Sequence, residues 1–486
     1  MCDALMNISP VDGRYERYTK PLRPIMSEFG LIKYRIDVMV RYFLALGQHD
    51  GIPLQLGQAD VEALESIIHA FAHDDAASIK QLETSGWNGI PATNHDLKSC
   101  ELWLRWKFNQ IGLGGHVEWI HFGCTSEDVN NIAYGLMLRD AVDALIEPLR
   151  SIADWLRDWA TQFGQMPMLS RTHGQPATPT TLGKEFAVFR ERLRRQMQQM
   201  ATLKVALKLN GASGNYAAMH AALPGVDWPQ FAQAFVEDGT YLRKGAHISF
   251  TFNPLTTQIE PHDTYAELFA VIMRINTILV DVAQDMWRYI SDEWIVQKAV
   301  SGEVGSSAMP HKVNPINFEN AEGNLQIANW LMEGCCRKLP VSRLQRDLSD
   351  TTVARMFGTI FGHCVVGYEN LRTGMKKVSP DAGKIRQALL DHPEVLTEAY
   401  QTILRSKGYP NAYDALKSLS RGAKITLADL HAFVDGLDSK FIDEETKKRM
   451  KEITPDVYVG LAPSLVPRQD PKTRLATPHD PTGVGR

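Results

Sequence analysis

Several signals that would assign this 486-residue chain to a familiar class are missing from its sequence. It has no run of about 18 consecutive apolar residues, so we expect no membrane span. Its first residues, MCDALMNISPVDGRYERY, lack the basic segment and apolar core of a secretory signal. The formal net charge is −4, so no general basic excess favours nucleic acid or an anionic membrane as the main partner. These absences favour a cytoplasmic protein, in which basic residues can still gather locally around a small anion.

Cysteine is scarce, and its spacing excludes further classes. The six cysteines are Cys2, Cys100, Cys124, Cys335, Cys336 and Cys364. None of them falls into paired CxxC spacing, which favours reduced thiols in packing roles over a disulfide framework or a zinc site. The segment GLGGH (112–116) follows no predicted strand, so it does not indicate a dinucleotide-binding loop.

Two long segments without glycine or proline dominate what the sequence does contain. From Thr264 to Val300, apolar residues recur at alternating spacings of four and three, and a similar stripe runs from Lys184 to Asn210. This period predicts long helices that pack side by side in a bundle. Core packing explains both stripes better than a cofactor site does, and helices of this length suit an elongated bundle rather than a small α/β domain.

The remaining patterns complete an all-α, three-domain prediction with a long central helical bundle. Further helices are predicted at about 25–47, 58–84, 94–109, 127–146, 148–163 and 317–338, with more after 382, whereas 247–252 is a short strand candidate. Composition shifts suggest an N-terminal helical domain (1–115), a central bundle domain (116–381), a C-terminal helical domain (382–461) and a tail (462–486). The tail is rich in proline and polar residues, which predicts disorder.

Two polar motifs precede predicted helices. In HFGCTSEDVNN (121–131), Thr125 and Ser126 stand before two acidic residues, which is the pattern of a helix N-cap, although two asparagines follow at once. In LSRTHGQPATPTTLGKE (169–185), His173 stands in a loop bounded by glycine and proline before a long helix. A lone histidine is usually structural, but this position suits proton transfer or contact with an anion.

The segment SGEVGSSAMPHKVNP (301–315) concentrates donors in a glycine-rich loop. Glycines let successive backbone N–H groups point at one anion, and Lys312 and Asn314 add a cation and an amide donor. This set suits a substrate carboxylate whose negative charge grows during the reaction. Chemistry does not decide between Ser306 and Ser307 as the reactive serine. A serine nucleophile would normally need a GxSxG elbow after a strand, and the chain has neither.

Arginines in other loops suggest a site for phosphate or carboxylate. The guanidinium fork suits both anions, although each arginine alone is more often a surface charge. The segment QRDLSDTTVAR (345–355) places Arg346, Thr351 and Arg355 close together, and GRY (13–15) supplies Arg14 and Tyr15. TNHD (93–96) and TTQIEPHD (256–263) each open a predicted helix, the second of them the longest predicted.

Together these motifs resemble a known family. GSSAMPHKVNP resembles the GSSxMPxKxNP loop of the fumarase/aspartase superfamily, and the TSED and THGQPATP motifs precede it in the expected order. SPVDGRY, TNHD, TTQIEPHD and KLPVSRLQRDLSD narrow the resemblance to bacterial adenylosuccinate lyases over residues 8 to 460. Segments 85–92 and 237–250 are longer than in that pattern, and Thr351 stands where the pattern has serine.

The resemblance implies an all-α homotetramer with active sites shared between subunits, and a carbon–nitrogen lyase without metal or organic cofactor. The reaction would release fumarate from adenylosuccinate, giving AMP, and from the succinylated aminoimidazole carboxamide ribotide of purine biosynthesis. Ser306 would be the general base and His173 the general acid. The implied substrate-binding residues are Arg14, Tyr15, Asn94, His95, Asp96, Thr125, Ser126, Gln258, Lys312, Asn314, Arg346, Thr351 and Arg355.

Two alternatives remain open at this stage. The first is another fumarate-releasing lyase of the superfamily, such as argininosuccinate lyase, although the arginine cluster and QRDLSD favour a phosphorylated nucleotide. The second is a helical bundle that serves as a scaffold without turnover. The combination of Ser306, His173, Lys312 and Asn314 argues against the scaffold.

Overall fold

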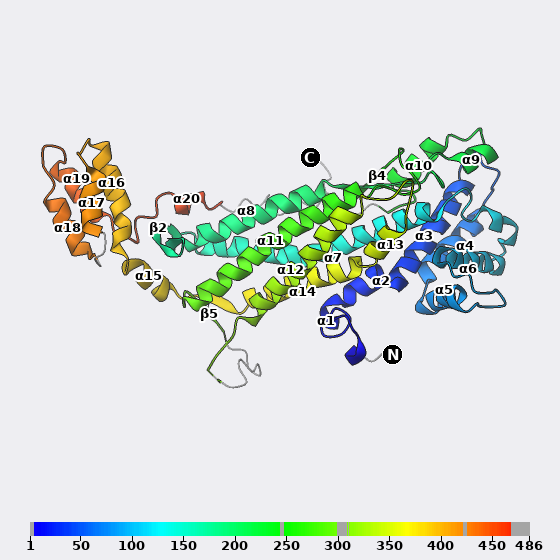
Figure 1. Ribbon diagram of the computed structural model, residues 1–486, viewed down its shortest axis with the longest axis horizontal. Coiled ribbons are helices and arrows are strands. Elements are labelled where there is room, and N and C mark those ends of the chain that lie inside the picture. Colours follow the sequence, from blue (N-terminus) through cyan, green and yellow to red (C-terminus); the bar gives the residue numbers. More distant parts are fainter. Residues whose placement is uncertain (1–3, 244–246, 299–308, 310, 421–424, 468–486) are drawn as a thin grey trace.

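The computed structural model describes the chain except for residues 1–3, 244–246, 299–308, 310, 421–424 and 468–486. The molecule is elongated around a bundle of long helices, which confirms the all-α prediction (Figure 1). The bundle comprises α7 (Ser126–Gln162), α8 (Leu182–Ala201), α11 (Asp263–Ser291), α12 (Ile316–Lys338) and α14 (Phe357–Met375). Within the described ranges, no helix is long and apolar enough to cross a membrane.

Shorter helices lie at the two ends of the bundle (Figure 1). The first end carries α3 (Glu28–Gly47), α4 (Gln58–Ala70), α5 (His73–Thr84), α6 (Asp96–Gln110), α9 (Ala217–Ala222) and α10 (Trp228–Glu237). The far end carries α15 (Ala382–Leu390), α16 (Thr397–Ser406), α17 (Ala412–Ser420), α18 (Leu427–Asp435) and α19 (Glu444–Glu452). The other short elements are η1 (Ala4–Met6), α1 (Glu16–Thr19), η2 (Lys20–Leu22), α2 (Arg23–Met26), η3 (Gly114–Trp119), α13 (Ser349–Ala354), η4 (Pro393–Leu396) and α20 (Ala462–Leu465).

The stripe of α11 forms the centre of the bundle, as its spacing predicts. Its members Leu268, Ile272, Ile275, Leu279, Val282 and Met286 are each at most 1% exposed. The helix nevertheless ends at Ser291 rather than near Val300, because Glu293 adopts a positive φ of 59°. Strand β5 (Ile295–Gln297) follows and pairs antiparallel with β6 (Val378–Pro380).

Four other predictions need correction. The helix predicted at 58–84 is the two helices α4 and α5. The helical stripe expected to reach Asn210 ends at Ala201, and β3 (Lys204–Leu207) pairs in parallel with β4 (Ser249–Phe252), which lies within the predicted strand 247–252. The two helices predicted at 127–146 and 148–163 are the single helix α7, with Pro148 inside it. At 37 residues α7 is longer than α11, so TTQIEPHD does not open the longest helix.

The segment around THGQPATP is a β-hairpin rather than an irregular loop. Strands β1 (Pro167–Thr172) and β2 (Gln175–Thr181) pair antiparallel, with Thr172 opposite Gln175. The two turn residues, His173 and Gly174, have φ of 54° and 75°, and positive φ at both positions matches the twist of a two-residue hairpin turn. The hairpin therefore holds His173 at its tip.

The buried apolar residues form two hydrophobic clusters. The larger spans the bundle and the N-terminal helices, and the smaller joins residues between Leu396 and Met450. The boundary proposed at 115 lies inside the larger cluster and stays a prediction. Helix α20 lies in the segment expected to be disordered, but it packs against α8 and β2, and Val466 beside it is only 8% exposed.

Candidate active site

The TSED motif forms the N-terminus of α7, in agreement with its N-cap pattern. Thr125 is the N-cap residue, and its backbone N–H donates to the Asp128 carboxylate at 2.8 Å. Ser126 is the first helical residue. Glu127 and Asp128 are 4% and 0% exposed, so the first-turn acidic residues point into the protein rather than into solvent.

Asp128 belongs to a buried ion pair with Lys208. The Lys208 ammonium lies 2.9 Å from the carboxylate, and both side chains are 0% exposed. Lys208 also donates to the backbone carbonyls of Gly211 and Gln258, at 3.0 and 2.8 Å. The backbone N–H groups of Asn210 and Gly211 donate to Asp128. The pair thus ties together the Thr125 turn, the 208–211 segment and the Gln258 loop.

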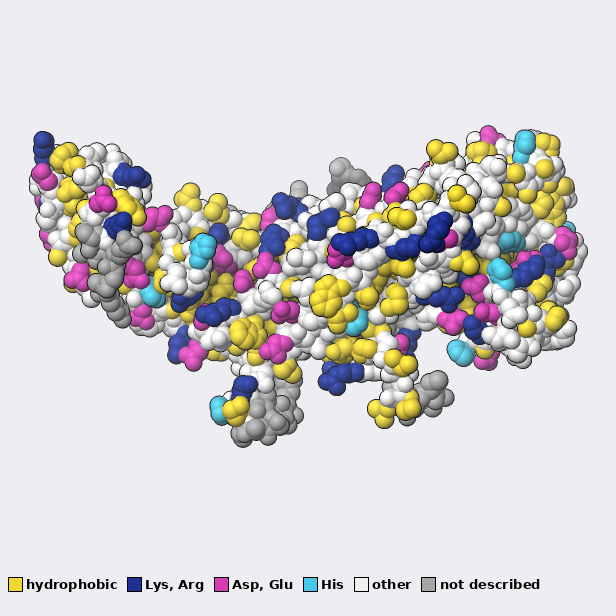
Figure 2. Space-filling view, viewed as in Figure 1, with side chains coloured by type: hydrophobic (Ala, Val, Ile, Leu, Met, Phe, Trp, Pro, Cys, Tyr) yellow, Lys and Arg dark blue, Asp and Glu magenta, His cyan; other side chains and the backbone are white. Residues whose placement is uncertain are grey.

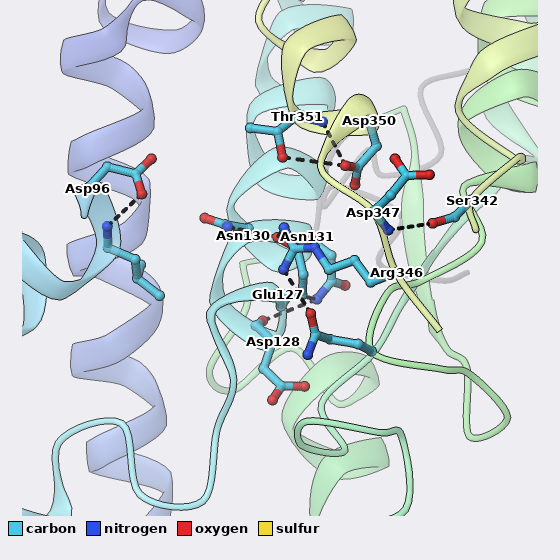
Figure 3. A network of polar contacts seen from close by, with 12 residues as sticks. Asp96, Glu127, Asp128, Asn130, Asn131, Ser342, Arg346, Asp347, Asp350 and Thr351 are labelled. Atoms are coloured by element: carbon cyan, nitrogen blue, oxygen red, sulfur yellow. Dashed lines mark hydrogen bonds and ion pairs between the residues drawn. The ribbon is translucent and has the colours of Figure 1, made fainter. Parts of the chain in front are cut away.

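Glu127 holds Arg346, which comes from the loop before α13. Arg346 Nη2 donates to Glu127 Oε1 at 2.8 Å, and Arg346 Nη1 donates to Gln258 Oε1 at 3.2 Å. Burial raises the pKa of Glu127, and the Arg346 guanidinium opposes that rise. Figure 3 shows Glu127 and Arg346 beside the first turn of α7. The predicted ligands Gln258 and Arg346 are therefore in direct contact.

A second arginine is held close by through Asp96. The Asp96 carboxylate lies 2.8 Å from Arg35 on α3 and 3.7 Å from Arg355. Burial opposes ionisation of Asp96, but Arg35, helped by the Leu97 backbone N–H and by His95, lowers the pKa of this carboxyl group. Arg355 is the C-cap residue of α13, and its side chain is 53% exposed.

The other residues of TNHD and α13 complete this region. Asn94 is exposed with a φ of 51°, and His95 is the N-cap of α6, where its Nδ1 accepts from the Lys98 backbone at 3.3 Å. Thr351 is half-buried, and its backbone N–H donates to the carboxylate of Asp350 at 2.8 Å. We call the following set the α7-end cluster: Asn94, His95, Asp96, Thr125, Ser126, Gln258, Arg346, Thr351 and Arg355.

Cavities lie beside Arg355, between the N-terminal segment and the start of α14. One of about 270 Å³ is lined by Asp12, Arg23, Glu28 and Arg355, among others. A second of about 150 Å³ shares Arg355 and Glu28 and is also lined by Tyr134 and Phe357. Arg355 therefore faces space that a ligand can enter.

His173, Lys312 and Asn314 lie beyond the opposite end of α11. The guanidinium of Arg171, near the tip of the hairpin, lies 5.7 Å from the centre of the Trp294 ring, just past the end of α11. The backbone carbonyl of Val313, between the other two predicted ligands, accepts from Gln297 Nε2 at 3.0 Å. His173 and Lys312 are both exposed. Ser306 lies outside the described residues.

Arg14 and Tyr15 occupy a third place, along the side of the bundle. The Tyr15 hydroxyl accepts from Asn320 Nδ2 of α12 at 3.4 Å, and Arg14 is exposed. Helix α11 has 29 residues, which at about 1.5 Å per residue is roughly 43 Å. Gln258 and Lys312 stand at opposite ends of this length, so one chain does not bring the predicted site residues together.

The buried partners of the site carry little signal in the sequence. Lys208 and Arg35 stand far along the chain from the carboxylates they contact, and no local motif marks either of them. The only available signal was the presence of charged residues in a mainly apolar helical stretch, as for Arg35 in GLIKYRIDVMV, which also holds Lys33 and Asp37. Among the described residues, no group of three or more His, Cys, Asp or Glu side chains is arranged to hold a metal ion.

The fold and a family match together define a lyase. Residues 13–328 match the family described as Lyase. Among solved structures, fumarate lyase from Mesorhizobium sp. BNC1 is 17% identical with a TM-score of 0.71, over 92% of this chain and 96% of that chain. The 3-carboxy-cis,cis-muconate lactonizing enzyme from Pseudomonas putida is 21% identical with a TM-score of 0.69, over 93% and 97% of the two chains. At these identities the likeness establishes the fold alone.

Closer relatives identify the family. Residues 342–459 match the family described as Adenylosuccinate lyase C-terminal. The adenylosuccinate lyase of Escherichia coli K12 is 43% identical over 95% of this chain and 98% of its own length. That of Legionella pneumophila Corby is 44% identical over the same shares. The chain belongs to the adenylosuccinate lyase family.

Proposed function

We propose that this protein cleaves adenylosuccinate to AMP and fumarate, and the succinylated aminoimidazole carboxamide ribotide in the same way, in cytoplasmic purine biosynthesis without a metal or organic cofactor. The observation that carries the proposal is near full-length similarity to adenylosuccinate lyases, at 43% identity over 95% of the chain. The α7-end cluster supports it, because two arginines and several hydrogen-bond donors suit a phosphorylated nucleotide.

The proposed chemistry is a β-elimination. Ser306 removes the Cβ proton of the succinyl group, and His173 protonates the departing nitrogen. Lys312 and Asn314 stabilise the doubly charged carboxylate that develops, while Thr125 and Ser126 bind the succinyl carboxylates. Donors placed at a developing charge are typically worth about 3 to 4 kcal/mol each, and an acid or a base adds roughly 10²–10⁴-fold. The exposed hairpin tip leaves His173 accessible to such a substrate.

We assign the remaining predicted substrate-binding residues to the nucleotide end of the substrate. Arg346 and Arg355 hold the phosphate with Arg14, Tyr15 and Thr351. Gln258 contacts the substrate directly, and Asn94, His95 and Asp96 line the site. Gln258 and Arg346 are hydrogen-bonded to each other, which supports their assignment to one substrate molecule.

We further propose that each site is completed by other subunits of a homotetramer. His173 and Lys312 lie roughly 43 Å along α11 from Gln258, which is much longer than a nucleotide. The bundle also exposes hydrophobic side chains along its length (Figure 2), among them Trp330 of α12 at 66% and Trp287 of α11 at 42%. Such surfaces support association between bundles, because large exposed apolar patches are unusual on monomers.

The activity is tested by ultraviolet absorbance. Purified protein is mixed in turn with adenylosuccinate, argininosuccinate, aspartate and malate. We expect turnover of adenylosuccinate and none of comparable efficiency with the other three. Turnover of argininosuccinate instead would favour a different member of the superfamily, and no turnover of any substrate would favour a scaffold.

The shared site is tested by mixing two inactive variants, Gln258→Ala and Ser306→Ala, after mild dissociation. Random exchange in a symmetric oligomer returns both native groups to roughly one site in four, so activity should rise well above that of either parent. Each variant taken through the same dissociation alone is the control. Verified subunit exchange without recovery of activity would exclude a site that takes these two residues from different chains.

A further inference from the structure

A continuous polar network joins the two arginines of the α7-end cluster. Glu127 Oε1 accepts from Arg346 Nη2 at 2.8 Å and also from Asn130 Nδ2 at 2.9 Å. Asn130 Oδ1 in turn accepts from Arg35 Nε at 2.9 Å. Arg35 Nη2 then donates to Asp96 Oδ2 at 2.8 Å, and the same carboxylate oxygen lies 3.7 Å from Arg355.

Charges alternate along this network, and its middle is buried. Arg35, Asn130 and Glu127 are 3%, 8% and 4% exposed, whereas the Arg355 side chain at one end is 53% exposed. The buried members are thus remote from solvent and act through the residues they hold. Because each carboxylate lies between two groups that donate to it or attract it, the position of each end arginine depends on the next member of the network.

Arg35 is the member that joins the two halves. Its Nε reaches the Glu127 half through Asn130, and its Nη2 reaches the Asp96 half, in the fixed geometry of one planar guanidinium. It comes from α3, a helix that supplies none of the predicted ligands. A lysine would keep the charge, but its single nitrogen cannot reproduce this fork.

We propose that Arg35 is a positioning residue for phosphate recognition: it fixes the separation of Arg346 and Arg355 so that the two guanidinium groups meet one phosphomonoester. The inference rests on the proposed nucleotide substrate. Arg35 itself does not touch the phosphate, so its effect should appear only in ligands that carry one.

The test compares the binding of AMP and of adenosine by titration calorimetry, using the full-length protein. Arg35→Lys should weaken AMP binding about tenfold to a hundredfold, the range expected for displacing a hydrogen bond to a charged group. Adenosine binding should change less than about twofold. With adenylosuccinate as substrate, KM should rise by a similar factor and kcat should change little, since the proposed role of Arg35 is confined to holding the phosphate-binding arginines.

The matched control is Arg41→Lys on the same helix. Arg41 bonds to Asp37, one helical turn away, at 2.6 Å, and it lies outside the network. This variant should bind AMP like the wild type. A second variant, Asn130→Leu, removes the link to Glu127 without removing a charge and should show the same selective loss of AMP binding.

The outcomes separate the two proposals. Failure of the wild type to bind AMP would overturn the proposed function itself. The role of Arg35 alone would be overturned if the wild type binds AMP but Arg35→Lys does not lose affinity selectively. That outcome is either an equal loss of affinity for AMP and adenosine or no loss of affinity at all. Circular dichroism shows whether the two network variants fold. If neither variant folds, the network is a requirement of the fold, and this outcome would also overturn the proposed role of Arg35.

Discussion

The buried pair of Lys208 and Asp128 allows a quantitative prediction. Both side chains are 0% exposed, and replacing Lys208 by methionine leaves the carboxylate without its cation. Removing one partner of a buried pair typically costs about 3–5 kcal/mol. Backbone N–H groups of Thr125, Asn210 and Gly211 continue to donate to Asp128, which favours the lower part of that range. We therefore expect Lys208→Met to lower the free energy of unfolding by about 3 kcal/mol.

Urea denaturation followed by circular dichroism measures this loss, at one protein concentration because subunit association contributes to stability. Arg337→Met is the control. Arg337 pairs with Glu333, but the two side chains are 78% and 54% exposed, so the change should stay within about 1 kcal/mol. The double variant Lys208→Met/Asp128→Asn should regain part of the loss, since no unpaired charge stays buried. A cost below about 1 kcal/mol for Lys208→Met alone would refute the reasoning.

Two further predictions concern charges elsewhere. Arg346→Ala should raise KM for adenylosuccinate strongly, and the increase should be smaller with a substrate that lacks phosphate. Steady-state kinetics with both substrates check this. An equal increase in KM for both substrates would remove Arg346 from the phosphate site. Burial, and then Asp281 and Glu185, raise the pKa of Asp285 from 3.8 to about 6. Between about pH 4 and pH 6 the folded state thus keeps a proton that the unfolded state releases, so the free energy of unfolding falls as pH rises through this range. Asp285→Asn should therefore unfold at a higher temperature than the wild type above pH 6 and at the same temperature below about pH 4; no difference at pH 7 would contradict this.

Periodicity in the sequence predicted the bundle but not where its helices end. The stripe of α11 is buried as expected, because a spacing of four and three places every member on one face. Its end at Ser291 depends on a left-handed Glu293 and on pairing of β5 with β6, more than eighty residues later in the chain. A break made by a non-glycine residue and a distant strand leaves no local signal in the sequence.

The candidate site was predictable where a motif is local. Thr125 is the N-cap that its neighbours indicate. Gln258 and Arg346, from two separate motifs, are hydrogen-bonded to each other, and their assignment to the substrate stays a prediction. The buried partners were not predictable, since contacts such as Lys208 with Asp128 are set by tertiary packing. The relation of Ser306 and His173 to the α7-end cluster stays a prediction.

The uninterrupted length of α11 also restricts where the chain can gain or lose residues. One residue inserted into this helix would rotate every later side chain by about 100° and advance it by about 1.5 Å, so that the stripe would leave the core. The neighbouring helices α8 and α12 would need the same insertion at the same height to restore the packing. Length variation is therefore expected outside the bundle. Segments 85–92 and 237–250, which we expect to be longer than in the family pattern, fit this expectation: their described residues lie between shorter elements at the first end of the bundle, where added chain leaves the separation between the two ends of α11 unchanged.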